Sequence, residues 1–274
     1  MTLPTSPTVR AVTIPGAHLH YEIRGGSGPL VLVIGSPMAS AEFAPLADAL
    51  AGDRTVVTYD PRGYANSPVD DPDAQSPVEQ RADDVKAILD DLCAESADVF
   101  GSSGGAVTGL ALVARHPGCV RTLIAHEPPL LELLPDAAEQ RAHTEAIVDT
   151  FHRDGFGAAW MLFMRNAGYD VSPDDAPSGP AEPSEDEVRQ AARFFEIDLL
   201  PTTRYRPDVD ALKNSPSRVV IGIGADSGRL LTYRTSVALA ELLRTPPVEF
   251  PGAHGGFLGA PTEFAEVLRQ VLSD

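Results

Sequence analysis

A serine flanked by glycines is the part of the sequence with the clearest chemical potential. Residues 101–105 read Gly-Ser-Ser-Gly-Gly and match the pattern G-x-S-x-G, centred on Ser103. An apolar segment, 97–100, precedes it and an apolar helical segment, 106–115, follows it. In a sharp strand-to-helix turn of this kind the central serine rises above the edge of a sheet, and the glycines avoid clashes. The pattern therefore predicts that Ser103 is a nucleophile and not part of a plain Gly/Ser turn.

A serine hydroxyl needs a general base to become nucleophilic at neutral pH. His254 lies in a glycine-rich turn directly after the apolar segment 247–250. This places it at the carboxyl end of a predicted strand, as for Ser103. His126 also ends an apolar segment and is the weaker candidate. We therefore expect His254 to be the base.

The base in turn needs a carboxylate that orients the imidazole and stabilises its cation. Two acidic residues stand at predicted strand ends. Asp226 follows the strand 218–223, and Glu127 follows the strand 120–125. Asp226 could instead cap the next helix, and Glu127 could instead be a pocket residue beside two prolines. The residues themselves leave the choice between Asp226 and Glu127 open.

The negative charge of a tetrahedral intermediate calls for two backbone N–H donors. Gly104 follows the nucleophile and opens a helix, so its N–H is the expected first donor. The second should come from the loop after the apolar segment 30–34. In that loop Ser36 is the candidate, because the following Pro37 has no N–H.

Apolar side chains near these loops are candidates for substrate binding. Trp160 and Phe163 belong to a helical stretch, and Met38 follows the predicted oxyanion loop. The alternative is that the large side chains of the helical stretch simply pack it onto the rest of the protein.

The order of elements predicts an α/β fold. Strand-like segments are expected at 18–24, 30–34, 55–59, 97–100, 120–125, 218–223 and 247–250, mostly separated by helical patterns. Such alternation predicts a mainly parallel sheet flanked by helices, with ligands at the carboxyl ends of the strands. Residues 130–215 interrupt it with helical patterns. We therefore predict a core of residues 1–129 and 216–274 and a helical lid over 130–215. Within the lid, the proline-rich, acidic stretch 170–187 predicts a mobile surface loop.

Three motifs resemble those of the α/β-hydrolase family over about residues 10 to 272. They are GSSGG at 101–105, the histidine turn PGAHGGF at 251–257, and DPRGYANS at 60–67. The last is similar to the family's DxRGxGxS turn, with Ala65 in place of the second glycine. More narrowly, the chain resembles actinobacterial, esterase-like serine hydrolases of uncertain substrate.

The resemblance implies the order nucleophile, acid, base along the chain, with Ser103 first and His254 last. It places the acid near Asp226. Many relatives, however, carry the acid three residues after the glycine, where this chain has Ser227. Some relatives take the acid from the strand that ends at Glu127.

The implied activity is hydrolysis of a carboxylic ester or thioester of a small or secondary-metabolite-like substrate through an acyl-enzyme. Epoxide hydrolases and dehalogenases need a carboxylate nucleophile, so Ser103 argues against them. A C–C bond hydrolase, a perhydrolase, a cofactor-free non-hydrolytic enzyme and a non-catalytic binding protein are the alternatives.

Composition limits the partners. The chain has 274 residues, of which 43% are hydrophobic and 22% charged, as in an ordinary globular protein. Its formal charge of −18 argues against nucleic acid and anionic membranes. We find no signal peptide and no long apolar run, so we expect a cytoplasmic protein. The chain has only two cysteines and no metal-binding pattern. We therefore expect an enzyme without cofactor or metal that acts on a small molecule. Whether it forms a homo-oligomer is open.

Overall fold

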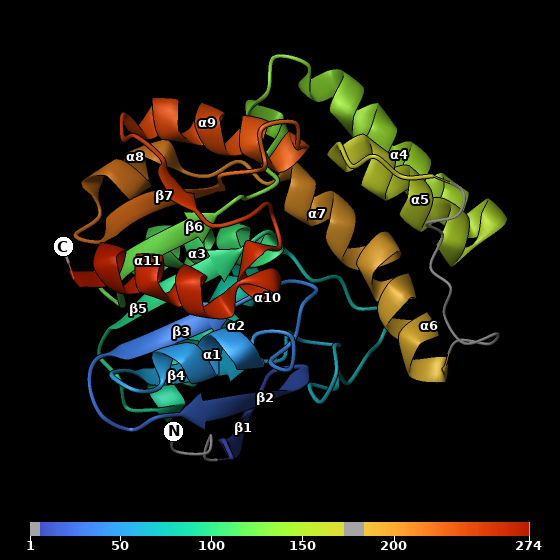
Figure 1. Cartoon of the computed structure of the whole chain (residues 1–274). Helices are drawn as coiled ribbons and strands as arrows, with labels where there is room; N and C mark the ends of the chain where they lie inside the picture. Colours follow the sequence, from blue (N-terminus) through green and yellow to red (C-terminus); the bar gives the residue numbers. More distant parts are fainter. Residues whose placement is uncertain (1–5, 173–183, 274) are drawn as a thin grey trace.

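The computed structural model describes residues 6–172 and 184–273, and an eight-stranded sheet lies at its centre (Figure 1). The strand order is β1-β2-β4-β3-β5-β6-β7-β8. β1 pairs with β2 and β2 with β4 in antiparallel fashion, and all the later pairs are parallel. The strands are β1 (Thr8–Ile14), β2 (Ala17–Arg24), β3 (Leu30–Ile34), β4 (Thr55–Tyr59), β5 (Ala97–Ser102), β6 (Val120–His126), β7 (Arg218–Gly224) and β8 (Val248–Phe250).

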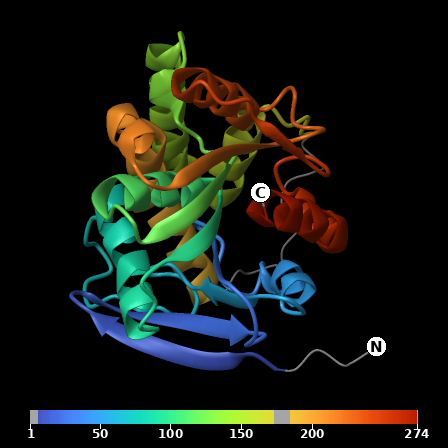
Figure 2. The same cartoon turned by 90° about the vertical axis from the view of Figure 1, so that its left-hand side faces the viewer.

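Helices cover both faces of the sheet (Figures 1 and 2). One face carries α1 (Ala44–Leu50), α10 (Gly256–Gly259) and α11 (Pro261–Ser273). The other carries α2 (Val78–Asp91), α3 (Gly104–Arg115), α8 (Val209–Asn214) and α9 (Leu231–Leu243). This explains why a central strand such as β3 is apolar throughout. In β3, for example, Val31 and Val33 pack under α1 and α11, whereas Leu32 and Ile34 pack under α2 and α3.

The connection between β6 and β7 is helical. It comprises η1 (Leu131–Leu133), α4 (Ala137–Asp154), α5 (Phe156–Ala167), α6 (Glu185–Ala192), the π-helix η3 (Arg193–Asp198), α7 (Leu199–Arg204) and α8. We call the part from η1 to α7, residues 131–204, the helical insertion. It projects from one side of the sheet (Figure 1). The prediction placed α8 with the lid, but Leu212 of α8 packs into the core beside α3 and α9.

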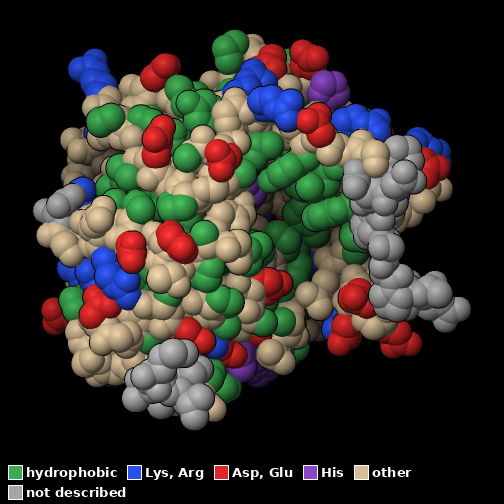
Figure 3. Space-filling model, in the orientation of Figure 1, with side chains coloured by type: hydrophobic (Ala, Val, Ile, Leu, Met, Phe, Trp, Pro, Cys, Tyr) green, Lys and Arg blue, Asp and Glu red, His purple; other side chains and the backbone are tan. Residues whose placement is uncertain are grey.

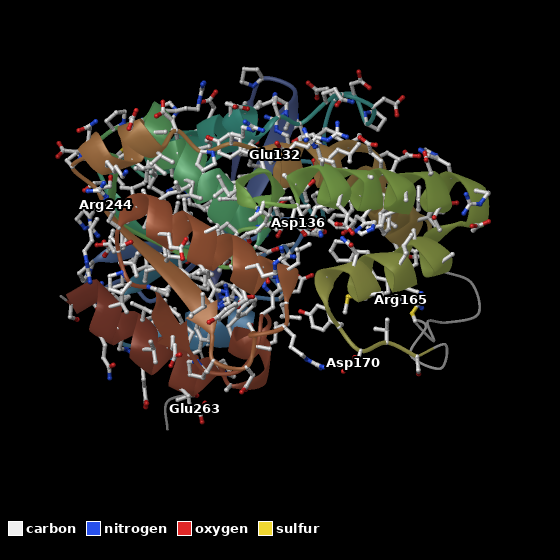
Figure 4. The ribbon with its side chains drawn as sticks, turned by 90° about the horizontal axis from the view of Figure 1, so that it is seen from above. Glu132, Asp136, Arg165, Asp170, Arg244 and Glu263 are labelled. Carbon is white, nitrogen blue, oxygen red and sulfur yellow. The ribbon has the colours of Figure 1, made fainter. Side chains whose placement is uncertain are left out.

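Ion pairs connect the helical insertion to α9 (Leu231–Leu243) and to the loop that precedes it. Asp136, just before α4, lies between α4 and α9 (Figure 4) and its carboxylate is 2.6 Å from Arg234 Nη2. Asp170, beyond α5, is 2.6 Å from Arg229. The second pair is highly exposed on both sides, so its contribution to stability is small.

The predicted strands and helices are present with shifts of one to a few residues at their ends. β1 was not predicted. The predicted mobile loop at 170–187 falls largely on residues 173–183, which lie outside the described residues. Its last part is helical instead, because Ser184 and Glu187 form a capping box that starts α6. In the described ranges, no helix combines the length and the apolarity that a membrane span requires.

Candidate active site

Ser103 occupies a strained turn between β5 and α3. Its backbone angles are φ 56° and ψ −121°, in a region that residues with side chains rarely adopt. The neighbouring glycines have no room for a side chain. A Cβ on Gly101 would lie 2.7 Å from the carbonyl oxygen of Gly105, and one on Gly105 would lie 2.2 Å from that of Ile34. Gly101 is therefore required by its close contact with the start of α3, and Gly105 by its close contact with the end of β3.

His254 follows β8 and meets a carboxylate from β6. Its Nδ1 lies 2.6 Å from Oε2 of Glu127, whose side chain is fully buried. The same Oε2 accepts a hydrogen bond of 2.8 Å from Thr232 Oγ1, and Oε1 accepts one of 2.9 Å from the N–H of Gly224. Three donors thus hold the carboxylate in one orientation toward the imidazole.

These partners favour the ionised form of Glu127. Burial alone would raise the pKa of its carboxyl group. The hydrogen bond from His254 and the charge that His254 can carry act against burial and lower the pKa to about 2. The backbone of Glu127 is also unusual, with φ 50°, and its N–H donates to Gly222 at 3.1 Å. The chain thus turns from β6 across the end of β7.

Asp226, the other candidate acid, does not reach this site. Its side chain is exposed, and its backbone N–H donates to the carbonyl of Gly252 at 3.0 Å. The next residue, Ser227, is fully buried. The turn after β7 therefore points Ser227 inward and Asp226 outward. Of the described carboxylates, Glu127 is the one hydrogen-bonded to His254.

The two predicted oxyanion donors lie together. Gly104 and Ser36 line the same cavity as Ser103 and His254. A Cβ on Gly104 would lie 2.7 Å from the carbonyl oxygen of Ser36, so the two loops are in contact. Gly104 opens α3, whose N-terminal N–H groups create a positive potential at this point.

The cavity has a volume of about 360 Å³ and lies between the sheet and the helical insertion. Figure 3 shows a hollow with hydrophobic side chains between these two parts. Met38, Trp160 and Phe163, the predicted substrate-binding residues, all contribute to its wall. Phe195, also on the helical insertion, is instead fully buried in the packing of that insertion. The large apolar side chains thus differ in position: some line the cavity, and Phe195 lies in the interior of the helical insertion.

His126 lies behind the site and is fully buried. Its ring is 5.5 Å from that of Phe264, 5.6 Å from that of Phe250 and 6.2 Å from that of His254, measured between centroids. Burial lowers the pKa of His126 to about 3, and nearby Glu127 only partly offsets this. His126 is thus a neutral histidine packed among aromatic rings and not an alternative base facing the cavity.

Several polar residues of the cavity wall were missed by the sequence analysis. Thr232 at the start of α9, Tyr169 after α5 and Asp198 at the end of η3 all line the cavity. Nothing in the sequence pattern marks Thr232 or Tyr169. Asp198 is one of two acids in the otherwise apolar segment Phe-Glu-Ile-Asp-Leu-Leu (195–200), and the sequence does not distinguish it from Glu196, which is exposed in the structure.

Comparison with known proteins identifies the family of this chain. A family model described as the alpha/beta hydrolase fold matches residues 28–158. The chain is 35% identical over 264 residues to the uncharacterised hydrolase YraK of Bacillus subtilis, an alignment that covers 94% of each chain. The chain therefore belongs to the α/β-hydrolase family, which confirms the resemblance found in the sequence, and it is a hydrolase of this fold.

Two solved structures illustrate the same fold in distant relatives. A structure from a study of carboxylesterases of Nitrososphaera gargenis has a TM-score of 0.71 and 18% identity, covering 96% of this chain and 98% of that chain. The enol-lactonase of Burkholderia xenovorans LB400 has a TM-score of 0.64 and 19% identity, covering 97% of this chain and 100% of that chain. At these identities the likeness concerns the fold alone.

Proposed function

We propose that this hydrolase cleaves a carboxylic ester, or the related thioester, through an acyl-enzyme on Ser103. The observation that carries the proposal is the 2.6 Å hydrogen bond between Glu127 and His254. It joins a buried carboxylate to a histidine whose cavity is shared with a serine in a strained elbow. This is the set of groups that acyl transfer to serine requires.

The proposed reaction follows from the orientation of the imidazole. Glu127 accepts from Nδ1 of His254, which leaves Nε2 free to take the proton of Ser103 as Oγ attacks the ester carbon. The N–H groups of Ser36 and Gly104 stabilise the oxyanion. His254 then returns the proton to the leaving alcohol, and a water molecule activated by the same nitrogen hydrolyses the acyl-enzyme.

The apolar cavity supports a substrate with a largely apolar body. Met38, Trp160 and Phe163 would contact that body, and the helical insertion would act as the lid that keeps bulk water from the acyl-enzyme. We therefore propose that these three residues bind the substrate and that the helical insertion is a lid.

Hydrolysis of p-nitrophenyl butyrate by purified variants tests the proposal. Ser103→Ala should lower kcat by at least about 10⁴-fold, since the nucleophile is lost. Ser102→Ala is the matched control, because Ser102 is the adjacent serine of the same turn, and it should retain the covalent chemistry. A Ser103→Ala variant that stays within tenfold of the parent rate would rule out nucleophilic catalysis by this serine.

A further inference from the structure

One carboxylate in the cavity wall has no role in the proposed acyl transfer. Among the described residues that line the cavity, Asp198 is the only acidic one, and it is 3% exposed. Its Oδ2 accepts a hydrogen bond of 2.6 Å from Tyr64 Oη. Its Oδ1 has no hydrogen-bond partner among the described residues. Oδ1 is itself buried, so a donor from the cavity reaches it only when neighbouring side chains shift. A buried acceptor without a donor is costly, and a donor that gains access to Oδ1 in this way would be bound favourably.

Two arginines flank this carboxylate without forming hydrogen bonds to it. Arg81 Nη2 is 3.9 Å from Oδ1, and Arg193 Nε is 3.8 Å from Oδ2. Both guanidinium groups donate elsewhere: Nε and Nη2 of Arg81 to the carbonyl of Ser76, and Nε of Arg193 to the carbonyl of Arg62. Neither arginine is among the described residues that line the cavity. Of these three side chains, Asp198 is therefore the one that contributes to the cavity wall, with Oδ1 buried behind it.

The local charge selects the kind of donor. Arg81 and Arg193 bring two positive charges against the single negative charge of Asp198, and the nearby Arg62 is already paired with Asp84 at 2.5 Å. An ammonium group would enter a region that is positive overall, which opposes its binding. A carboxylate on the substrate would also be unsuitable, because it has no proton to donate to the acceptor Oδ1. A neutral hydroxyl group satisfies Oδ1 without adding charge.

Asp198 is connected through Arg81 to the loop that carries Ser36. Nη1 of Arg81 donates to Thr202 Oγ1 at 2.8 Å and to Ser36 Oγ at 3.4 Å. One guanidinium group therefore connects the Asp198 side of the cavity to the loop that carries the predicted oxyanion donor. Elsewhere the wall is dominated by apolar side chains such as Trp160 and Phe163. A polar substituent that reaches Asp198 would belong to an otherwise apolar molecule.

We propose that Asp198 accepts a hydrogen bond from a hydroxyl group of the substrate. This rests on the proposed ester hydrolysis and narrows its substrate class to esters whose acyl or alcohol part is apolar but carries a hydroxyl group. Asp198 is then a specificity-determining residue that takes no part in the proton transfers.

The test compares matched esters that differ by one hydroxyl group. One set is methyl hexanoate and its hydroxyhexanoate regioisomers, and the other is hexyl butyrate and the monobutyrates of hexanediols, all followed by acid release. At one hydroxyl position, the parent should show a kcat/KM about 10- to 100-fold above that of the unsubstituted ester, as one hydrogen bond to a charged acceptor implies.

Asp198→Asn should remove this preference. Tyr64 donates to the side chain, so the amide oxygen of asparagine would take that bond and the amide NH₂ would face the cavity as a donor. The ratio of kcat/KM for the hydroxylated ester to kcat/KM for the unsubstituted ester should fall at least about tenfold. This ratio cancels any common loss of rate caused by removing the charge beside Arg81 and Arg193. Glu196→Gln is the matched control, because it removes the same charge from a partly exposed position of the same π-helix.

Two outcomes would overturn the inference while leaving the ester hydrolysis intact. One is a parent enzyme that hydrolyses the unsubstituted esters with no preference at any hydroxyl position. The other is an Asp198→Asn variant that loses activity equally on all esters, which would make the residue merely structural. A parent enzyme that hydrolyses none of the esters would overturn the proposed function and the inference together.

Discussion

The turns that follow β6 and β7 begin on neighbouring strands, and each carries a carboxylate, but they present it differently. After β6 the backbone at Glu127 adopts φ 50° and crosses toward β7, where the carboxylate accepts from Gly224. After β7 the backbone follows β8 instead, because the N–H groups of Ala225 and Asp226 donate to Phe250 and Gly252. Asp226 is left facing solvent. The path of the chain beyond a strand thus decides whether an acid at its end reaches the site.

Among the variants that compare the two turns, Glu127→Gln should have the largest effect. The amide keeps the shape of the side chain but cannot stabilise a cationic His254 in the same way, so kcat for ester hydrolysis should fall by about 10³- to 10⁴-fold. Circular dichroism should show an intact fold. Activity within tenfold of the parent would mean that the β6 turn does not supply the acid.

Thr232→Val should have a smaller effect. It removes the 2.8 Å hydrogen bond to Glu127 Oε2 and the hydroxyl 3.5 Å from His254 Nδ1, so kcat should fall by roughly tenfold, the worth of one hydrogen bond to a charged group. Thr232→Ser keeps the hydroxyl and should restore most of the rate. Equal losses in both variants would point to packing and not to the hydrogen bond.

His126→Leu should alter the acid stability and not the orientation of the catalytic groups. The pKa of His126 is about 3 in the folded protein, against an ordinary value of 6.5, so the unfolded chain binds a proton first as pH falls. The free energy of unfolding therefore decreases from pH 6.5 toward pH 3, and Glu127, with a pKa of about 2 against 4.5, adds a loss below pH 4.5.

Urea unfolding between pH 6.5 and 4.5 measures this effect. In His126→Leu the free energy of unfolding should fall less steeply with decreasing pH than in the parent. The slope should differ by up to about 1.4 kcal/mol per pH unit, which corresponds to the uptake of one proton on unfolding. His143→Leu, an exposed histidine on α4, is the control and should leave the slope unchanged. A His126→Leu variant with the parent slope would show that the buried ring takes up its proton in the folded state too.

The smallest expected effect is that of Asp226→Asn, which completes the comparison of the two turns. Because this side chain is exposed and away from His254, kcat/KM should stay within about twofold of the parent. A loss of tenfold or more would mean that the turn after β7 contributes to catalysis.

Local patterns predicted much of the fold. The apolar runs at 30–34 and 55–59 coincide with β3 and β4, because a strand covered on both faces leaves a continuous apolar signal. β1 was missed because it is an exposed edge strand, and its residues, such as Thr8 and Arg10, carry no such signal. The elbow at Ser103 was predictable since strand, turn and helix are adjacent in sequence.

The remaining features of the site depend on contacts between distant segments. Glu127 and His254 are 127 residues apart in the chain, and whether Glu127 or Asp226 faces His254 depends on the turn that each strand makes at the sheet edge. The same holds for Asp198, whose position is set by Tyr64 and two arginines from elsewhere in the chain. Periodicity and local motifs do not contain that information.

The most direct test of the account is intact-mass analysis after incubation with a fluorophosphonate. The account predicts one adduct on the parent protein, none on Ser103→Ala, much slower labelling of Glu127→Gln, and labelling of Asp226→Asn at the parent rate. An unlabelled, folded parent would contradict an activated Ser103. Slow labelling of Asp226→Asn together with parent-like labelling of Glu127→Gln would contradict the assignment of the acid to the β6 turn.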